Sequence, residues 1–282
     1  MNYLSGFFDK EKKLGSYLVR FLPLILSIIY FNKPKISNKL ELIILLIIGI
    51  LVFLSSERAA LFLLVISYSF YFLVSNKKIL FLSFVAIIFI SLFTFQKNLT
   101  QKYINFTLHQ TGLYLLLNPS PRPVNRDIVR YYSYEHENLS FTALVAFKKN
   151  YFFGGGVKSF YFDCRDSIKK FQFKVSKRNN RMVCSTHPHN TYIQILSEIG
   201  IFGFIIVVFV FLKILLINFK IALTKNKNNL IKSYFFINLS IIINIMPFIP
   251  SGNFFNNWMS LMIFLPIGFW LYLHDKIKNN VY

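Results

Sequence analysis

The side chains most able to do chemistry gather in the segment from Cys184 to Asn190, CSTHPHN, which directly precedes a long apolar run. Asn is a strong N-cap residue, so Asn190 predicts that a helix begins at Thr191. His189 then stands beside the exposed amides of a helix N-terminus, where anions are favoured. Because of this position, His189 is our first candidate for a functional residue. His187 is a candidate substrate contact.

Asn190, Gln194 and Glu198 recur at intervals of four residues below the histidine pair. At that spacing they form one polar stripe along the predicted helix. The ordinary interpretation is a polar loop followed by a capped helix. Ionisable groups are costly inside a membrane and are kept there mainly for function, so we predict that Asn190 and Glu198 contact substrate.

Arginines form a second group of candidates. Ser55-Ser56-Glu57-Arg58 lies between two apolar runs, so Arg58 would open a helix, where a cation does not complement the helix dipole. Its planar fork suits a pair of phosphate oxygens, so Arg58 is our candidate for a functional contact with a phosphate group. The alternative is an interfacial arginine that extends to the membrane surface. Further candidates for substrate binding are Arg20 and Arg130.

The two cysteines, Cys164 and Cys184, allow two interpretations. If both face an oxidising compartment, they form a disulfide, and closing that loop contributes roughly 3 kcal/mol. If they are thiolates, they could bind zinc together with His187 and His189. The spacing fits no closed zinc pattern, so we predict the disulfide and expect neither a metal nor a cofactor.

The elements that must position these residues are apolar. The chain has 55% hydrophobic and only 15% charged residues, and long uncharged runs alternate with short lysine-rich segments. A spanning helix needs about 20 mostly apolar residues. The sequence therefore predicts an all-α integral membrane protein with about seven transmembrane helices, at Tyr17–Phe31, Leu40–Leu54, Ala59–Ser75, Ile79–Phe95, Thr191–Ile217, Ile231–Phe248 and Phe254–Leu273.

The lysines predict the orientation of these helices. Short basic connections mark the cytoplasmic side, which leaves the long loop 96–190 on the outer, periplasmic face. We expect three parts: membrane helices in 1–95, a periplasmic loop with short helices in 96–190, and membrane helices in 191–282. The N-terminus then starts outside, so we expect further helices upstream of this chain. The net charge of +21 is explained by orientation signals and anionic glycolipids, and we expect no nucleic-acid partner.

Three segments resemble the O-antigen ligase and polymerase superfamily. THPHNTYIQILSEIGIFG (186–203) is similar to its His-Asn signature with a Gly at the head of a helix, and SSERAA (55–60) to its periplasmic arginine segment. FTALVAFKKNYFFGGGVKSF (141–160) resembles its loop helix and glycine turn. A second arginine usually stands seven residues before the alanine of that helix, and here that position is His136.

The resemblance implies a metal-independent, inverting glycosyltransferase in a bacterial inner membrane, multi-pass, with its active face in the periplasm. It would move a glycan from a polyprenyl-pyrophosphate donor to lipid A–core or to another growing glycan. In such an enzyme His189 would be the catalytic residue that orients or deprotonates the acceptor hydroxyl, since imidazole is neutral over much of the periplasmic pH range. Arg58 would hold the pyrophosphate and stabilise the charge on the leaving group. The sequence leaves ligase and polymerase both open. A transporter and an inactive membrane fragment are the alternatives, although a transporter should carry its charged site near the bilayer midplane.

Overall fold

The computed structural model describes residues 4–8, 13–32, 38–75, 97–111, 134–171, 184–225 and 227–279, together with residues 85, 86, 90 and 94. Within these residues the chain is helical and has no strand, which confirms the predicted all-α class for the described part. Contacts divide the chain into two compact units. The first comprises Met1–Tyr103, Phe211–Met246 and Leu261–Tyr282, and the second comprises Ile104–Val210 and Pro247–Ser260.

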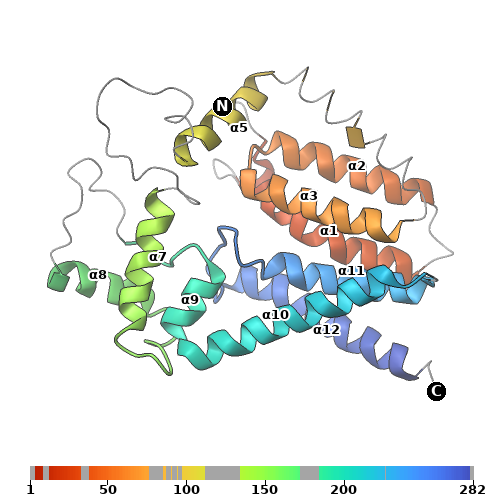
Figure 1. Ribbon diagram of the computed structural model, residues 1–282. Coiled ribbons are helices and arrows are strands. Elements are labelled where there is room, and N and C mark those ends of the chain that lie inside the picture. The colour runs from red at the N-terminus through yellow and green to blue at the C-terminus, as the bar shows by residue number, and fades with distance from the viewer. Residues whose placement is uncertain are drawn as a thin grey trace. The chain divides into compact units, whose positions relative to one another are not determined.

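The first unit is built around one central helix. This helix, α1, packs against α2, α3 and α11, and a short 3₁₀-helix, η1, precedes it (Figure 1). Their bounds are η1 Gly6–Phe8, α1 Leu14–Phe31, α2 Asn38–Leu54, α3 Arg58–Val74 and α11 Asn229–Asn244. Since α11 is buried from Lys232 to Asn244, its apolar residues form the core of this unit with those of α1.

Polar contacts fix α1 against α11. The Ser27 hydroxyl donates to the carbonyl of Ser233, and the Ser233 hydroxyl donates back to the carbonyl of Ser27, both at 2.8 Å. Small residues let helix backbones approach closely, and such bonds are typical of helices packed in membranes. Arg20 is buried, and its guanidinium donates to the carbonyls of Ile243 and Asn244 at 3.2 Å. A cation is favourable at the C-terminus of a helix, so Arg20 stabilises the end of α11.

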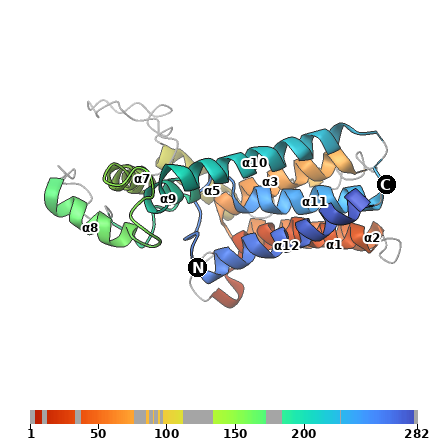
Figure 2. The same cartoon turned by 90° about the horizontal axis from the view of Figure 1, so that it is seen from below.

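Among the residues that the structure describes, the second unit contains three short helices, α7 (Tyr134–Phe147), α8 (Phe160–Phe171) and α9 (Thr191–Glu198). Helix α7 lies beside α9 in both views (Figures 1 and 2). The buried core of this unit is formed by residues of α7 and α8, namely Leu139, Ala143, Phe160 and Cys164. In the described part of the chain, three further helices have residues in both units: α5 (Lys97–Thr111), α10 (Gly200–Leu223) and α12 (Asn257–Asn279).

Most predicted helices that fall in the described residues are present. Helices α1, α2, α3 and α11 start and end within about four residues of the predicted bounds, and α12 continues further, to Asn279. The predicted helix Ile79–Phe95 lies mainly outside the described residues, although residues 85, 86, 90 and 94 are helical.

The prediction of a single helix over Thr191–Ile217 is wrong, because the helix is interrupted at Ile199, between α9 and α10. Gly200 has φ 81°, in the left-handed region, where a helix of L-residues does not continue. A β-carbon there would lie 2.3 Å from the carbonyl oxygen of Phe152. Gly154 is placed in the same way, since its β-carbon would lie 2.3 Å from the carbonyl carbon of Glu198. The two glycines therefore let the 150–157 turn dock against the break.

Two of the described helices, α1 and α10, are long and apolar enough to cross a membrane, and α2 and α3 contain shorter apolar segments. Only 11% of the most apolar window of α10 is buried, whereas the core helix of a soluble protein is mostly buried. A large exposed apolar surface marks contact with a membrane or a partner. These helices support a membrane protein, and the predicted number of seven spans stays a prediction.

We expect Gly200→Ala to lower the melting temperature of the purified protein in detergent. The left-handed backbone costs an L-residue about 1–2 kcal/mol, and the contact with Phe152 adds to that cost. Gly268→Ala is the matched control, because a β-carbon at Gly268 in α12 meets nothing within 4 Å. Alanine is also the better helix former, so the control should keep or raise the melting temperature. Equal melting temperatures for the two variants would contradict this explanation of the break.

Candidate active site

His189 is held in an unusual backbone conformation directly before α9. Its φ is 55°, in the left-handed region, which costs a non-glycine residue about 1–3 kcal/mol and persists only where the surroundings impose it. The surroundings are visible on both sides. The His189 carbonyl accepts a hydrogen bond from the Ser251 amide at 2.9 Å, and Asn190 is the N-cap of α9. Strained residues of this kind cluster at functional sites, so the geometry supports a functional role for His189.

Asn190 fixes the start of α9 with both ends of its side chain. The amide oxygen accepts from the backbone amides of Tyr192 at 3.0 Å and Ile193 at 3.1 Å, as the predicted N-cap requires. The amide nitrogen donates to the carbonyl of Pro247 at 2.7 Å. These bonds give Asn190 a positioning role, and its predicted contact with substrate stays a prediction.

His187 is buried and its imidazole is bonded on both nitrogens. Nε2 lies 3.3 Å from the Ser251 carbonyl, which can only accept, so Nε2 carries the proton. Nδ1 then accepts from the Thr186 hydroxyl at 3.0 Å. This pairing fits a neutral ring of fixed tautomer, and its centroid lies 4.1 Å from that of His189.

A third histidine joins the pair. His136, on α7, meets the His189 ring edge-on, with ring centroids 5.6 Å apart. Sequence reasoning noted His136 only as the residue that replaces an expected arginine, and the contact with His189 could not be predicted from it. Among the described residues no group of three or more His, Cys, Asp and Glu is arranged to hold a metal ion.

The histidine cluster favours a neutral His189. Burial lowers its pKa to about 4, and the nearby His187 and His136 act in the same direction, while the hydrogen bond with Ser251 opposes them. Burial likewise lowers the pKa of His187. A neutral imidazole can accept a proton, and Nε2 of His189 lies 3.4 Å from the Ser185 hydroxyl.

The polar stripe on α9 binds the surrounding loops. Gln194 is fully buried and donates to Asn253 Oδ1 at 2.8 Å and to Glu198 Oε2 at 3.2 Å. Its own oxygen accepts from the amide of Phe254 at 2.9 Å. Gln194 thus ties α9 to the segment that also holds His189, and the predicted descent of the stripe into the membrane stays a prediction.

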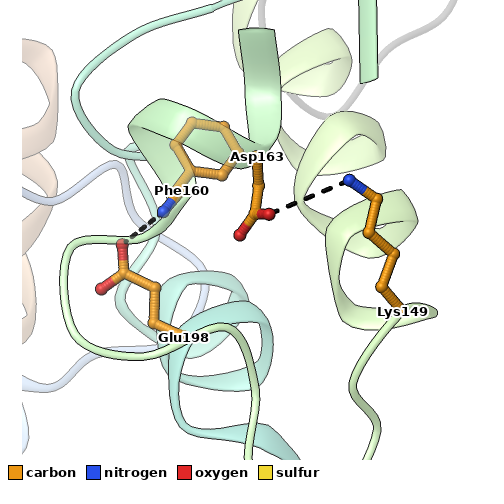
Figure 3. A network of polar contacts seen from close by, with 4 residues as sticks. All are labelled: Lys149, Phe160, Asp163 and Glu198. Carbon is orange, nitrogen blue, oxygen red and sulfur yellow. Dashed lines mark hydrogen bonds and ion pairs between the residues drawn. The ribbon is translucent and has the colours of Figure 1, made fainter. Parts of the chain in front are cut away.

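Glu198 closes the other end of the stripe. Its carboxylate accepts from the backbone amides of Lys158 at 3.0 Å and Phe160 at 3.4 Å, and Figure 3 shows the second of these bonds. Burial raises the pKa of Glu198, and these hydrogen bonds, with that from Gln194, lower it. Nearby, Lys149 pairs with Asp163 at 3.8 Å (Figure 3). Glu198 thus anchors the start of α8, and its predicted contact with substrate stays a prediction.

Cys164 and Cys184, the pair predicted from the sequence, form a disulfide with Cα atoms 5.6 Å apart. Cys164 is fully buried on α8, and Cys184 begins the segment that carries the histidines. The alternative of cysteine thiolates as zinc ligands is therefore wrong, because neither sulfur is a free thiolate. The disulfide instead fixes the histidine segment to α8.

The arginine candidates lie in the other unit or outside the described residues. Arg58 is the first residue of α3, as predicted. Glu57, just before it, is buried and accepts from the α1 amides of Gly15 at 2.6 Å and Ser16 at 3.1 Å. Glu57 thus caps α1, a role that the sequence did not reveal, because the two segments are 41 and 42 residues apart. The carbonyl contacts of Arg20 account for its burial, and Arg130 lies outside the described residues.

A tyrosine that sequence reasoning missed lies near Arg58. The Tyr103 hydroxyl donates to the carbonyl of Phe53 at 2.9 Å, close to the turn before Arg58. Burial and the charge of Glu57 raise the pKa of Tyr103, and the charge of Arg58 opposes them. Tyr103 is therefore a neutral hydroxyl within electrostatic range of the arginine.

Comparison with known proteins identifies the stretch that carries the histidines. Residues 135–208 match the O-antigen ligase family. This confirms the family resemblance for α7, the glycine turn, α8, the histidine segment, α9 and the first part of α10. No curated protein and no solved structure matches the chain.

The O-antigen ligase match includes His136, His187 and His189, whereas Arg20, Arg58 and Arg130 lie outside it. The family is membrane-associated and consists of ligase- or polymerase-like enzymes that act on glycans and lipid-linked substrates. The three histidines of the cluster therefore all lie within the stretch that matches the family, and their roles stay predictions.

We expect His189 to stay reactive as a neutral imidazole well below the usual histidine range. Diethyl pyrocarbonate modifies only the neutral ring, and the pKa of His189 is lowered to about 4. Mass spectrometry of the folded protein should therefore show His189 modification that persists at pH 5, where a histidine of ordinary pKa is mainly protonated. A control peptide covering Cys184 to Asn190 should lose its reactivity as the pH falls through about 6.5. Loss of His189 modification in step with the peptide would contradict the effect of burial.

Proposed function

We propose that this protein is a glycosyltransferase that moves a glycan from a polyprenyl-pyrophosphate donor to a sugar hydroxyl, without a metal ion. The observation that carries the proposal is His189, a neutral histidine fixed before α9 within the stretch that matches the O-antigen ligase family. The acceptor is lipid A–core if the enzyme is a ligase and another growing glycan if it is a polymerase.

The reaction assigns one step to each group. The acceptor hydroxyl oxygen attacks the anomeric carbon of the donor glycan, and its proton moves to the imidazole of His189. The bond between that carbon and the pyrophosphate oxygen breaks, and the electron pair leaves with the polyprenyl pyrophosphate. Attack from the face opposite the leaving group inverts the anomeric centre. A positioned base of suitable pKa is what this step needs.

The leaving group requires cations. A pyrophosphate gains negative charge as the bond breaks, and a guanidinium fork can bind two of its oxygens at once. Arg58 is our first candidate for this role and Arg130 the second. Arg20, Asn190 and Glu198 hold helices and loops in place through their hydrogen bonds. Their predicted contacts with substrate stay part of the proposal. His187 orients the His189 ring beside it.

Two observations support a multi-pass protein with its active face in the periplasm of a bacterial inner membrane. The disulfide between Cys164 and Cys184 belongs to an oxidising compartment, and it lies in the same unit as His189. The exposed apolar surface of α10, which begins directly after α9, suits the lipid of the membrane.

We predict that His189→Ala reduces glycan transfer by about 10²–10⁴-fold, the usual contribution of a general base. His187→Ala should cost less, because its ring contacts His189 rather than the acceptor. Arg58→Lys should also impair transfer although the charge is kept, since lysine cannot offer a bidentate fork. Transfer from purified lipid-linked donor, measured with the protein reconstituted in vesicles, gives all three rates.

The controls separate chemistry from folding. Each variant must insert into the membrane and keep the melting temperature of the wild-type protein. EDTA should leave the rate unchanged. Near-normal turnover in His189→Ala would remove the central role of this residue, and loss of activity in EDTA with recovery in zinc would refute the metal-independent reaction.

A further inference from the structure

The turn between α7 and α8 exposes a set of large aromatic side chains. We call residues 147–158, with the sequence FKKNYFFGGGVK, the aromatic loop. Phe152 is 63% exposed and Phe153 is 77% exposed, and Tyr151 and Val157 are exposed beside them. Isolated exposed apolar residues need no explanation, but a contiguous group of this size marks a surface that contacts something apolar.

The aromatic loop continues the apolar surface of α10. The ring of Phe202, near the start of α10, lies 6.0 Å from the ring of Phe152 and 5.6 Å from that of Phe153. Phe202 is itself exposed, and the exposed residues Ile205, Ile206 and Phe209 follow it along the helix. Because α10 is long and apolar enough to span a membrane, the loop lies at the end of a candidate span, where tyrosines such as Tyr151 typically meet the lipid headgroups.

The backbone holds the aromatic loop in this position. The Tyr151 carbonyl accepts from the amide of Ile201 at 2.8 Å, and the amides of Gly155 and Gly156 donate to the carbonyls of Ser197 and Glu198 at 3.0 and 2.9 Å. These three bonds join the loop to both sides of the break between α9 and α10. The backbone of the loop is therefore fixed beside the start of α10. The aromatic rings cannot move away from the solvent-exposed surface unless these hydrogen bonds break.

The aromatic loop is also basic. Lys148, Lys149 and Lys158 are exposed within it, and it contains no acidic residue. Asp163, on α8, pairs with Lys149. Basic residues beside aromatic ones are typical of segments that bind the interface of an anionic bilayer, where lysines are attracted to the lipid phosphates.

We propose that the aromatic loop inserts into an anionic phospholipid leaflet, with Phe152 and Phe153 among the acyl chains and the three lysines at the lipid phosphates. The leaflet is the one in which α10 begins. Because the loop is bonded to the break, and α9 runs from that break to His189, this insertion sets the depth of the histidine cluster relative to the bilayer. A protein partner that covers the same rings is the competing occupant. The proposal does not depend on the transfer reaction.

A fluorescent label at position 153 tests the insertion. Phe153→Cys is labelled with the environment-sensitive dye NBD in the full chain, reconstituted in vesicles of phosphatidylcholine with or without phosphatidylglycerol. The native cysteines are joined in a disulfide and should not react without a reductant. We expect strong quenching by brominated lipid acyl chains, and quenching by aqueous iodide several-fold weaker than for free NBD–cysteine. Both effects should be larger with phosphatidylglycerol.

Charge variants test the lipid specificity. Replacing Lys148, Lys149 and Lys158 by glutamine should remove the difference between the two lipid compositions. Replacing the exposed Lys220, Lys225 and Lys278 by glutamine removes the same charge from the other unit and should leave the difference intact. Iodide quenching equal to that of free dye in both vesicles would overturn the insertion, because the label would then lie in water. Protection from iodide without quenching by brominated acyl chains would also overturn it and would point to a protein that covers the rings. Equal insertion in both vesicles would overturn the role of anionic lipid.

Discussion

The structure around the histidines depends on how the start of α9 is held. The segment after α11 supplies two bonds to it: Ser251 donates to the carbonyl of His189, and the Pro247 carbonyl accepts from the side chain of Asn190. The carbonyl of Ser251, in turn, accepts from the ring of His187 and fixes its orientation. These contacts hold His189 at a positive φ that its own preferences disfavour. Burial of its imidazole lowers the pKa to about 4, which favours the neutral ring. A base fixed in this way loses little freedom when a substrate hydroxyl arrives.

The break between α9 and α10 explains why the glycines matter. Gly154 and Gly200 stand where each would meet the backbone of the other segment if it carried a β-carbon. Their close approach lets the aromatic loop pack against the end of α9. The disulfide between Cys164 and Cys184 fixes the histidine segment that precedes α9. These backbone contacts and the disulfide therefore connect the histidine segment to α10, which is apolar enough to span a membrane.

The sequence predicted what local pattern controls and missed what distant contacts control. The apolar runs gave α1, α2, α3 and α11 to within a few residues, and Asn190 predicted its own cap, because both signals lie within a few residues of the feature. The break at Ile199 interrupts a continuous apolar run, and it depends on a turn that lies about fifty residues earlier. The partner of Arg20 is 223 residues away, and no spacing rule connects them. The contact between His136 and His189 could not be predicted either. The sequence showed only that His136 stands seven residues before Ala143, where the resemblance leads one to expect an arginine.

The most direct test of the proposed transfer is to count the products of the reconstituted wild-type protein. A purified glycan on polyprenyl pyrophosphate, labelled in both the sugar and the phosphate, is supplied with lipid A–core and with unlabelled lipid-linked glycan. Glycosyl transfer predicts one molecule of free polyprenyl pyrophosphate for each glycan attached to either acceptor, because one glycosidic bond forms for each donor bond that breaks. Donor that stays intact, or pyrophosphate lipid released without any glycan attached, would contradict it.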